Sequence, residues 1–390
     1  MLLKIVISSV LLPDMEESEA GSRLSLVDIF KGVVITLVVL THVLFAMNGD
    51  SESPVIFQCL FLGLFGFMLL SGYFYRPGRG FVANMKKRFF QLAVALTVCT
   101  VVITALSYVW CVVWGQNVDS DDFVNALSLG MALNKSFVPL DSGVTWSGCM
   151  NCIGYYYIWA MLVAFVVFYA LADHVIDDWK RSIAALAVLV VAACALRELY
   201  PYGLPFYAHI SLAAASFMMA GAMAAKVRLI ERVQDFRWGS WRFWALFLGS
   251  LAAGIILVAI FPPGTKITRA YYGEYGGYSF LSYFVEVLLI NTAYLCMAAI
   301  VVKVRPVTRL LSSIGRHTFG ILLFHGFVVA FLTVPFFTFG PDDWLPAELT
   351  SSDKVLIFFA TMVICMAICV YGPVLLERIR AAIGRGRSAE

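Results

Sequence analysis

Charged residues are scarce in this 390-residue chain: Asp, Glu, Lys and Arg make up 14% of it, against about 25% in soluble proteins. Hydrophobic residues make up 61%, and a soluble fold of this size has too little polar sequence here to cover its surface. This scarcity excludes a soluble nucleic-acid-binding domain, a disordered chain and a coiled coil. The apolar residues instead fall into long blocks between short polar stretches, which predicts a polytopic membrane protein.

Apolar stretches of about 20 residues, the length that crosses a bilayer as a helix, recur along the whole chain. They predict an all-α integral membrane protein with about ten transmembrane helices. The ten ranges are 32–48, 54–75, 89–114, 151–172, 182–200, 206–225, 243–261, 279–302, 317–339 and 355–376.

Positive and negative charges alternate between the connections of these predicted spans. Most of the 28 Lys and Arg residues lie before the first span, in 76–88, 180–181, 226–242 and 303–316, and in the C-terminal tail. The acidic residues of the other connections are Asp50, Glu52, Asp119, Asp121, Asp122, Asp141, Glu274, Asp342, Asp343, Glu348 and Asp353. Because cytoplasmic loops carry the excess of Lys and Arg, we expect both termini in the cytoplasm.

The N-terminal residues 1–24 form a short leader in this interpretation, followed by a transmembrane domain at 25–376 and a basic cytoplasmic tail at 377–390. Residues 1–12 are apolar but too short to span, and an acidic stretch follows them rather than a small-residue cleavage site. We therefore expect no signal peptide, and Met15 is an alternative start. The expected location is the cell membrane, which in a bacterium is the inner membrane.

His42 and Lys31 are the most informative polar residues of the first span. Residues 25–28 (SLVD) have the form of a capping box, so a helix is expected to begin at Ser25, with Lys31 near the interface. His42 follows eleven residues later, about 16 Å deeper and on the same helix face. Lys31 could be an interfacial anchor and His42 a helix–helix contact. The functional alternative is a general base at the end of a path whose mouth is positively charged.

Several motifs, in order, resemble the membrane acyltransferase-3 family, including its fucose 4-O-acetylase-like members. The opening residues 26–32 (LVDIFKG) lead into His42, as in the family pattern of Arg or Lys, ten residues and His. A Phe-rich segment ends in Ser-Gly-aromatic, and the family's late Gly/Ser-rich pattern ending in His has its counterpart here. These further matches are residues 65–74 (FGFMLLSGYF), 86–88 (KKR), 156–159 (YYIW) and 314–325 (IGRHTFGILLFH).

The resemblance implies a ten-helix enzyme that moves an acyl group, usually acetyl, from a cytoplasmic thioester such as acetyl-CoA to a hydroxyl of an extracytoplasmic or lipid-linked glycan. It also implies that His42 is catalytic and that Lys31 belongs to its motif. Two residues depart from the family: Lys31 stands where most members have Arg, and Gln91 stands where many have the second Arg of an Arg-x-x-Arg pair.

Other candidate residues have both a functional and a structural interpretation. The basic cluster between the second and third spans could hold the donor's phosphates or simply set topology and bind anionic lipid. Its members are Arg76, Arg79, Lys86, Lys87 and Arg88. His325 lies inside the ninth span, where it could line the site or make a helix–helix hydrogen bond. Glu286, inside the eighth span, could orient a histidine, bind the acceptor or be structural.

No metal is expected, because Cys149 and Cys152 form a lone Cys-x-x-Cys pair without nearby histidines. The predicted function is a membrane O-acyltransferase with an acyl-CoA donor, a glycan or lipid-linked sugar acceptor, membrane lipids around it and no nucleic-acid partner. His42 would act as a base in direct transfer or carry the acyl group covalently. The alternative is a secondary transporter or glycan flippase without acyl-transfer chemistry.

Overall fold

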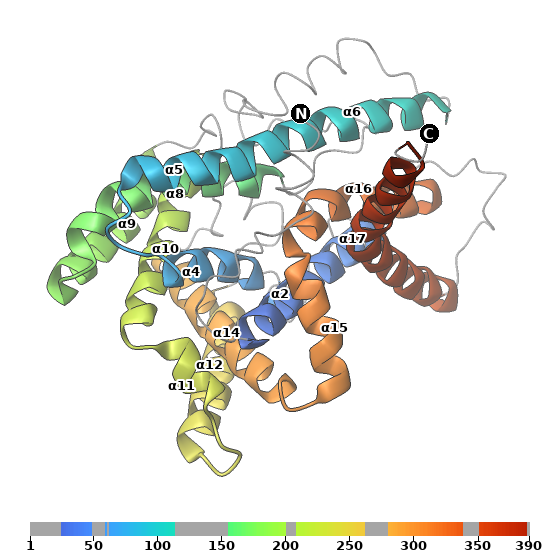
Figure 1. Cartoon of the computed structure of the whole chain (residues 1–390). Coiled ribbons are helices and arrows are strands. Elements are labelled where there is room, and N and C mark those ends of the chain that lie inside the picture. The colour runs from blue at the N-terminus through green and yellow to red at the C-terminus, as the bar shows by residue number, and fades with distance from the viewer. Residues whose placement is uncertain are drawn as a thin grey trace.

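The computed structural model describes residues 25–48, 59–60, 62–113, 155–199, 208–261, 280–337 and 351–387. Every regular element within these ranges is helical (Figure 1). In chain order they are α2 (Ser25–Asn48), the 3₁₀ helix η1 (Gly63–Phe65), α4 (Gly66–Tyr73), α5 (Phe81–Phe89), the π-helix η2 (Phe90–Val94), α6 (Ala95–Val113), α8 (Tyr155–Val175), α9 (Trp179–Leu199), α10 (Ala208–Lys226), α11 (Leu229–Gln234), α12 (Trp241–Ile260), α14 (Phe280–Val301), α15 (Arg305–Arg316), α16 (Thr318–Phe337) and α17 (Ser351–Arg387).

A helix lies over each of the ten predicted spans, which confirms the all-α class. Within the described ranges, six segments are long and apolar enough to cross a membrane. They lie in α2, α8, α9, α12, α14 and α17, and shorter apolar helices lie at Gly63–Tyr73, Ile210–Lys226 and Thr318–Val329. The protein is therefore a multi-pass helical membrane protein, while the number of ten spans and the side of each terminus stay predictions.

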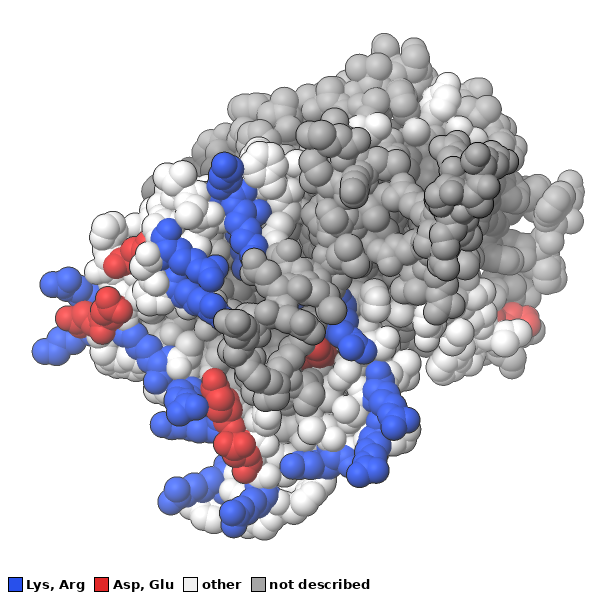
Figure 2. Space-filling view, in the orientation of Figure 1, with Lys and Arg blue, Asp and Glu red and all other residues white. Residues whose placement is uncertain are grey.

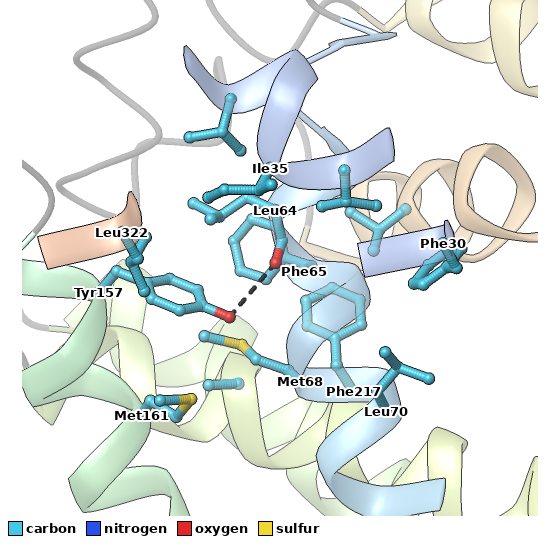
Figure 3. Close-up of a cluster of buried hydrophobic side chains, with 14 of the residues drawn as sticks. Phe30, Ile35, Leu64, Phe65, Met68, Leu70, Tyr157, Met161, Phe217 and Leu322 are labelled. Carbon is cyan, nitrogen blue, oxygen red and sulfur yellow. Dashed lines mark hydrogen bonds between the residues drawn. The ribbon is translucent and has the colours of Figure 1, made fainter. Parts of the chain in front are cut away.

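The core gathers around α2 and the segment η1–α4. Leu26, Ile29 and Ile35 of α2 are completely buried. Figure 3 shows the aromatic part of this core, where Phe65 and Met68 lie between the rings of Tyr157 and Phe217. Tyr157 donates a hydrogen bond of 3.3 Å to the carbonyl oxygen of Leu64, so α8 is fixed to η1 by a polar contact as well as by packing (Figure 3).

Glycines bring two pairs of helices into backbone contact. A Cβ on Gly315 of α15 would overlap the carbonyl oxygen of Asp28, and one on Gly32 of α2 would overlap the carbonyl oxygen of Leu311. A second reciprocal contact joins α4 and α10 through Gly72 and Gly221. Small residues at facing positions are how membrane helices approach closely. Only glycine fits at these positions, so the contact of α2 with α15 is set by sequence at two points.

The structure adds detail that the hydropathy pattern did not contain. The third predicted span begins earlier, because α5 starts at Phe81 and continues through the π-turn η2 into α6. Short helices α11 and α15 occupy connections expected only as basic loops, and α17 continues to Arg387 through the predicted tail. The leader, the pair Cys149 and Cys152, and most of the acidic connections lie outside the described residues.

Candidate functional site

Two histidines from helices far apart in sequence meet inside the molecule. His42 lies on α2 and His325 on α16, and their ring centroids are 5.0 Å apart with the ring planes inclined by 51°. His325 is completely buried, whereas His42 is partly exposed. The structure therefore brings together two of the three residues that the sequence proposed as catalytic.

The hydrogen bonds of His325 determine which of its nitrogens is available. Its Nδ1 lies 2.8 Å from the carbonyl oxygen of Ile321 and 3.0 Å from that of Leu322. Carbonyl oxygens only accept, so Nδ1 carries the hydrogen and the neutral ring has its lone pair on Nε2. This Nε2 is buried and has no hydrogen-bond partner. The arrangement leaves one open acceptor atom on a fixed ring beside His42.

Lys31 lies on α2, about three turns before His42, and is held by its own helix. Its Nζ is 3.5 Å from Asp28 Oδ1; the Lys31 side chain is 28% exposed and that of Asp28 7%. The backbone of Asp28 is also the surface that α15 touches at Gly315. The cation is thus fixed at the contact between α2 and α15, on the helix that carries His42.

The basic cluster of residues 76–88 lies in another part of the molecule. Arg76, Arg79 and Lys87 are exposed on the 74–80 loop and α5. The loop turns through Gly78 and Gly80, which have φ of +86° and +76°. In Figure 1, α5 lies beside α8 and well apart from α15 and the N-terminal end of α2. The structure therefore does not bring this cluster to Lys31.

Arg88 differs from the other basic residues of the cluster because it is partly buried. Its Nε lies 3.4 Å from the Tyr169 hydroxyl, its Nη1 lies 3.3 Å from Gln91 Oε1, and its guanidinium sits 5.2 Å from the centre of the Phe165 ring. Gln91 thus holds Arg88 from the next turn of the helix. Arg88 is oriented by α8, whereas the rest of the cluster faces outward.

Asp173 of α8 was missed in the sequence although it organises the 74–80 loop. Its carboxylate accepts hydrogen bonds from the Tyr75 hydroxyl and from the backbone N–H of Gly78, the latter at 3.3 Å. Burial and the neighbouring carboxylate raise the pKa of the Tyr75 hydroxyl, so it stays a hydrogen-bond donor at neutral pH. The sequence did contain a signal for Asp173, because it is a carboxylate at the end of a predicted span, next to a connection that carries basic residues.

Basic side chains gather on one part of the surface. Figure 2 shows Lys and Arg over the ends of α5, α9 and α11 and along α15, with several acidic side chains between them. These elements carry four of the connections that the sequence predicted to face the cytoplasm. The clustering agrees with the predicted alternation of charge.

Glu286 is separate from the histidine pair. It is 1% exposed on α14, and neither carboxylate oxygen has a hydrogen-bond partner. It therefore makes no hydrogen bond with His42 or His325. Nearby on the same helix, the Asn291 amide donates to the carbonyl oxygens of Leu62 at 3.0 Å and Val287 at 2.9 Å, which joins α14 to the segment before η1.

The side chains that meet at this position are two imidazoles. Among the described residues, no group of three or more His, Cys, Asp or Glu side chains lies close enough to hold a metal ion. The open lone pair of His325 and the partly exposed ring of His42 can together accept, hold and return a proton.

Comparison with known proteins gives one match. A model of the acyltransferase-3 family, described as an acyltransferase domain, matches residues 25–372. No curated protein and no solved structure matches the chain.

Proposed function

The chain belongs to the acyltransferase-3 family, and from that premise we propose that it is an O-acyltransferase. Its donor would be acetyl-CoA or another acyl-CoA, and its acceptor a hydroxyl of an extracytoplasmic or lipid-linked glycan. The family and the membrane-spanning helices support a membrane acyltransferase, and the finer assignments are ours. The observation that carries the proposal is the pairing of His42 with His325, 5.0 Å apart between ring centroids.

In the proposed reaction His42 acts as the general base. It takes the proton from the acceptor hydroxyl while that oxygen attacks the thioester carbonyl carbon. The tetrahedral intermediate then collapses, the C–S bond breaks, and the imidazolium of His42 returns the proton to the leaving thiolate. The products are the acyl ester of the glycan and free coenzyme A, so the protein ends the cycle unchanged.

His325 has the role of a positioning residue in this scheme. Its Nδ1–H is committed to the backbone of α16, so its Nε2 can only accept a hydrogen bond. When His42 becomes charged, an N–H of its imidazolium can be donated to this lone pair, which stabilises the ion in a site with little water. The ring of His325 thereby does for His42 what a carboxylate does in other histidine-based sites.

The donor's phosphates need cations on the cytoplasmic side. We propose that the exposed residues Arg76, Arg79 and Lys87 meet the phosphates, with Arg88 held in place behind them by Tyr169 and Gln91. Lys31 lies on the same helix as His42 and would guide the acyl end toward that histidine. We leave Glu286 outside the proton-transfer step, because its oxygens bond to neither histidine.

The test is thioester consumption by the purified protein, with His42→Ala beside the wild type. We expect His42→Ala to bind acetyl-CoA normally and to consume it about 10³-fold more slowly, because the general base is missing. His174→Ala is the matched control, since His174 is exposed at the end of α8 and lies outside the site. Full activity in His42→Ala would overturn the mechanism, and no consumption of any acyl-CoA by the wild type would favour a transporter.

A covalent variant of the mechanism makes a different prediction. If His42 first accepts the acyl group itself, a radiolabelled acyl donor without acceptor would leave label on the wild-type protein and none on His42→Ala. Direct transfer leaves both proteins unlabelled. Rapid quenching followed by separation of protein from donor distinguishes these two routes.

A further inference from the structure

Helix α15 connects the apolar helices α14 and α16 and packs against α2. It follows α14 after a tight turn, in which the Thr308 hydroxyl lies 2.8 Å from the carbonyl oxygen of Val301 and 3.2 Å from that of Val302. At its other end the Thr318 hydroxyl donates to the Gly315 carbonyl at 2.6 Å. Hydrogen bonds at both ends thus hold α15 where a membrane-crossing helix ends.

The charges of α15 lie on one face. At 100° per residue, Arg305, Arg309 and Arg316 fall within about 40° of one another around the helix axis. All three are exposed, and residues 303–316 contain no acidic residue. Nothing on α15 itself neutralises this stripe.

The opposite face of α15 is apolar and only partly covered. Ile314 and Gly315 are buried against α2, but Val307 is 39% exposed and Leu310 59% exposed. An apolar face opposite a row of arginines is typical of a helix that lies in the headgroup region of a bilayer. The long arginine side chains reach headgroup phosphates while the apolar side chains enter the acyl region.

From this geometry we propose that α15 is a docking surface for anionic phospholipids, whose headgroups bind Arg305 and Arg309 while the exposed Val307 and Leu310 on the opposite face contact the acyl region. The occupant follows from charge complementarity together with the exposed apolar edge, because a soluble phosphate compound would match the arginines but not the apolar side chains. Lipid held by α15 also steadies α2, since Gly315 and Leu311 touch the backbone of Asp28 and Gly32 directly. The surface thus connects the surrounding lipid to the helix that carries Lys31 and His42.

The binding test is native mass spectrometry of the purified full chain, titrated with phosphatidylglycerol or with phosphatidylcholine of the same acyl chains. We expect the wild type to prefer phosphatidylglycerol and Arg305→Gln/Arg309→Gln to bind it about thirtyfold more weakly, since each basic residue near a membrane contributes about 1 kcal/mol. Arg305→Lys/Arg309→Lys keeps the charge and should stay within about threefold of the wild type.

Arg232→Gln/Arg237→Gln is the matched control, because it removes two exposed basic residues from and beside α11. It should leave phosphatidylglycerol binding within about threefold of the wild type. An equal loss in this control would overturn the proposal in favour of diffuse attraction to the whole basic surface. Equal binding of the two lipids by the wild type would also overturn it, and so would displacement of phosphatidylglycerol by coenzyme A, which would assign the arginines to the donor.

A second measurement tests the link to α2 and rests on the proposed function. In nanodiscs, replacing part of the phosphatidylcholine by phosphatidylglycerol should raise thioester consumption in the wild type but not in Arg305→Gln/Arg309→Gln. Equal stimulation of the two proteins would overturn the link. If no protein consumes thioester in either lipid, the proposed function fails, while lipid binding is still decided by mass spectrometry.

Discussion

The histidine pair between α2 and α16 and the polar pair on α14 both lie within apolar helices, but they use their polar atoms differently. His325 commits one nitrogen to its own helix and leaves the other open beside the ring of His42. Asn291 commits its amide nitrogen to the carbonyl oxygens of Leu62 and Val287. Its Oδ1 and both carboxylate oxygens of Glu286 have no hydrogen-bond partner. In the first region an open lone pair has a second titratable side chain next to it.

We propose that this difference distinguishes residues of the reaction from residues that join helices. A buried polar side chain is expensive in a membrane, and many such residues bind another helix or belong to a functional site. The burial of Asn291 is explained by its hydrogen bond to Leu62, which joins α14 to the segment before η1. The histidines form no hydrogen bond with each other, and we propose that they lie together because both take part in the reaction.

Among substitutions of the residues around His42, the largest effect should come from His325→Phe, which keeps a ring in place but removes Nε2. We expect the turnover rate to fall about 100-fold with donor binding unchanged, because His42 loses the acceptor that stabilises its charged form. Thioester consumption at saturating and limiting donor separates the two quantities.

His317→Phe is the control for this substitution. The Nδ1 of His317 lies 2.8 Å from the carbonyl oxygen of Ser313, four residues earlier, as in His325. His317 therefore loses the same kind of hydrogen bond without losing a partner of His42. Equal loss of activity in both variants would mean that the bond to the helix matters and that the open nitrogen does not.

The sequence was sufficient for the apolar helices but not for the short helices α11 and α15. Hydropathy located a helix at each predicted span. Side-chain periodicity within α2 could not show which helix faces His42, because that partner lies near the other end of the chain. The motif resemblance suggested His325 as a candidate, and the structure supplies the contact.

The arrangement of the basic residues was beyond prediction for a related reason. Charge counts place residues on one side of a membrane but do not say which helices are neighbours. Arg88 turns toward Tyr169, and the 74–80 loop is fixed by Asp173 through Tyr75, so this cluster is organised by α8. Lys31 instead lies where two glycines allow α2 to touch α15.

The next effect is on stability and concerns the support of the histidine region. Gly315→Ala places a Cβ on the carbonyl oxygen of Asp28, so α2 and α15 must separate. We expect a loss of about 2 kcal/mol, seen as a lower midpoint of thermal unfolding in detergent. In the control Gly249→Ala, the new Cβ meets no atom within 4 Å, so stability should stay equal or rise by up to about 1 kcal/mol. Equal unfolding midpoints for Gly315→Ala and the wild type would show that the contact between α2 and α15 does not require glycine.

Asn291→Leu tests the adhesive role of the α14 pair. The Leu62 carbonyl loses its donor from α14, which should cost about 1 kcal/mol of stability while thioester consumption stays close to that of the wild type. Thr292→Val is the control, because the Thr292 hydroxyl bonds only within its own helix, to the Leu288 carbonyl at 2.7 Å. A loss of activity larger than the loss of folded protein would place Asn291 in the reaction and remove the distinction between the two regions.

The smallest effect should come from Glu286→Gln. This substitution is also the most direct test of whether the polar pair on α14 is separate from the histidine pair. The amide keeps the shape of the carboxyl group but cannot ionise, and burying a neutral group costs less than burying a charge. Since neither oxygen bonds to a histidine, we expect thioester consumption within about threefold of the wild type, well below the general-base effect expected at His42 and His325. A fall as large as that of His325→Phe would mean that the carboxylate reaches the histidines during turnover. The two regions would then be one site that closes around its substrates.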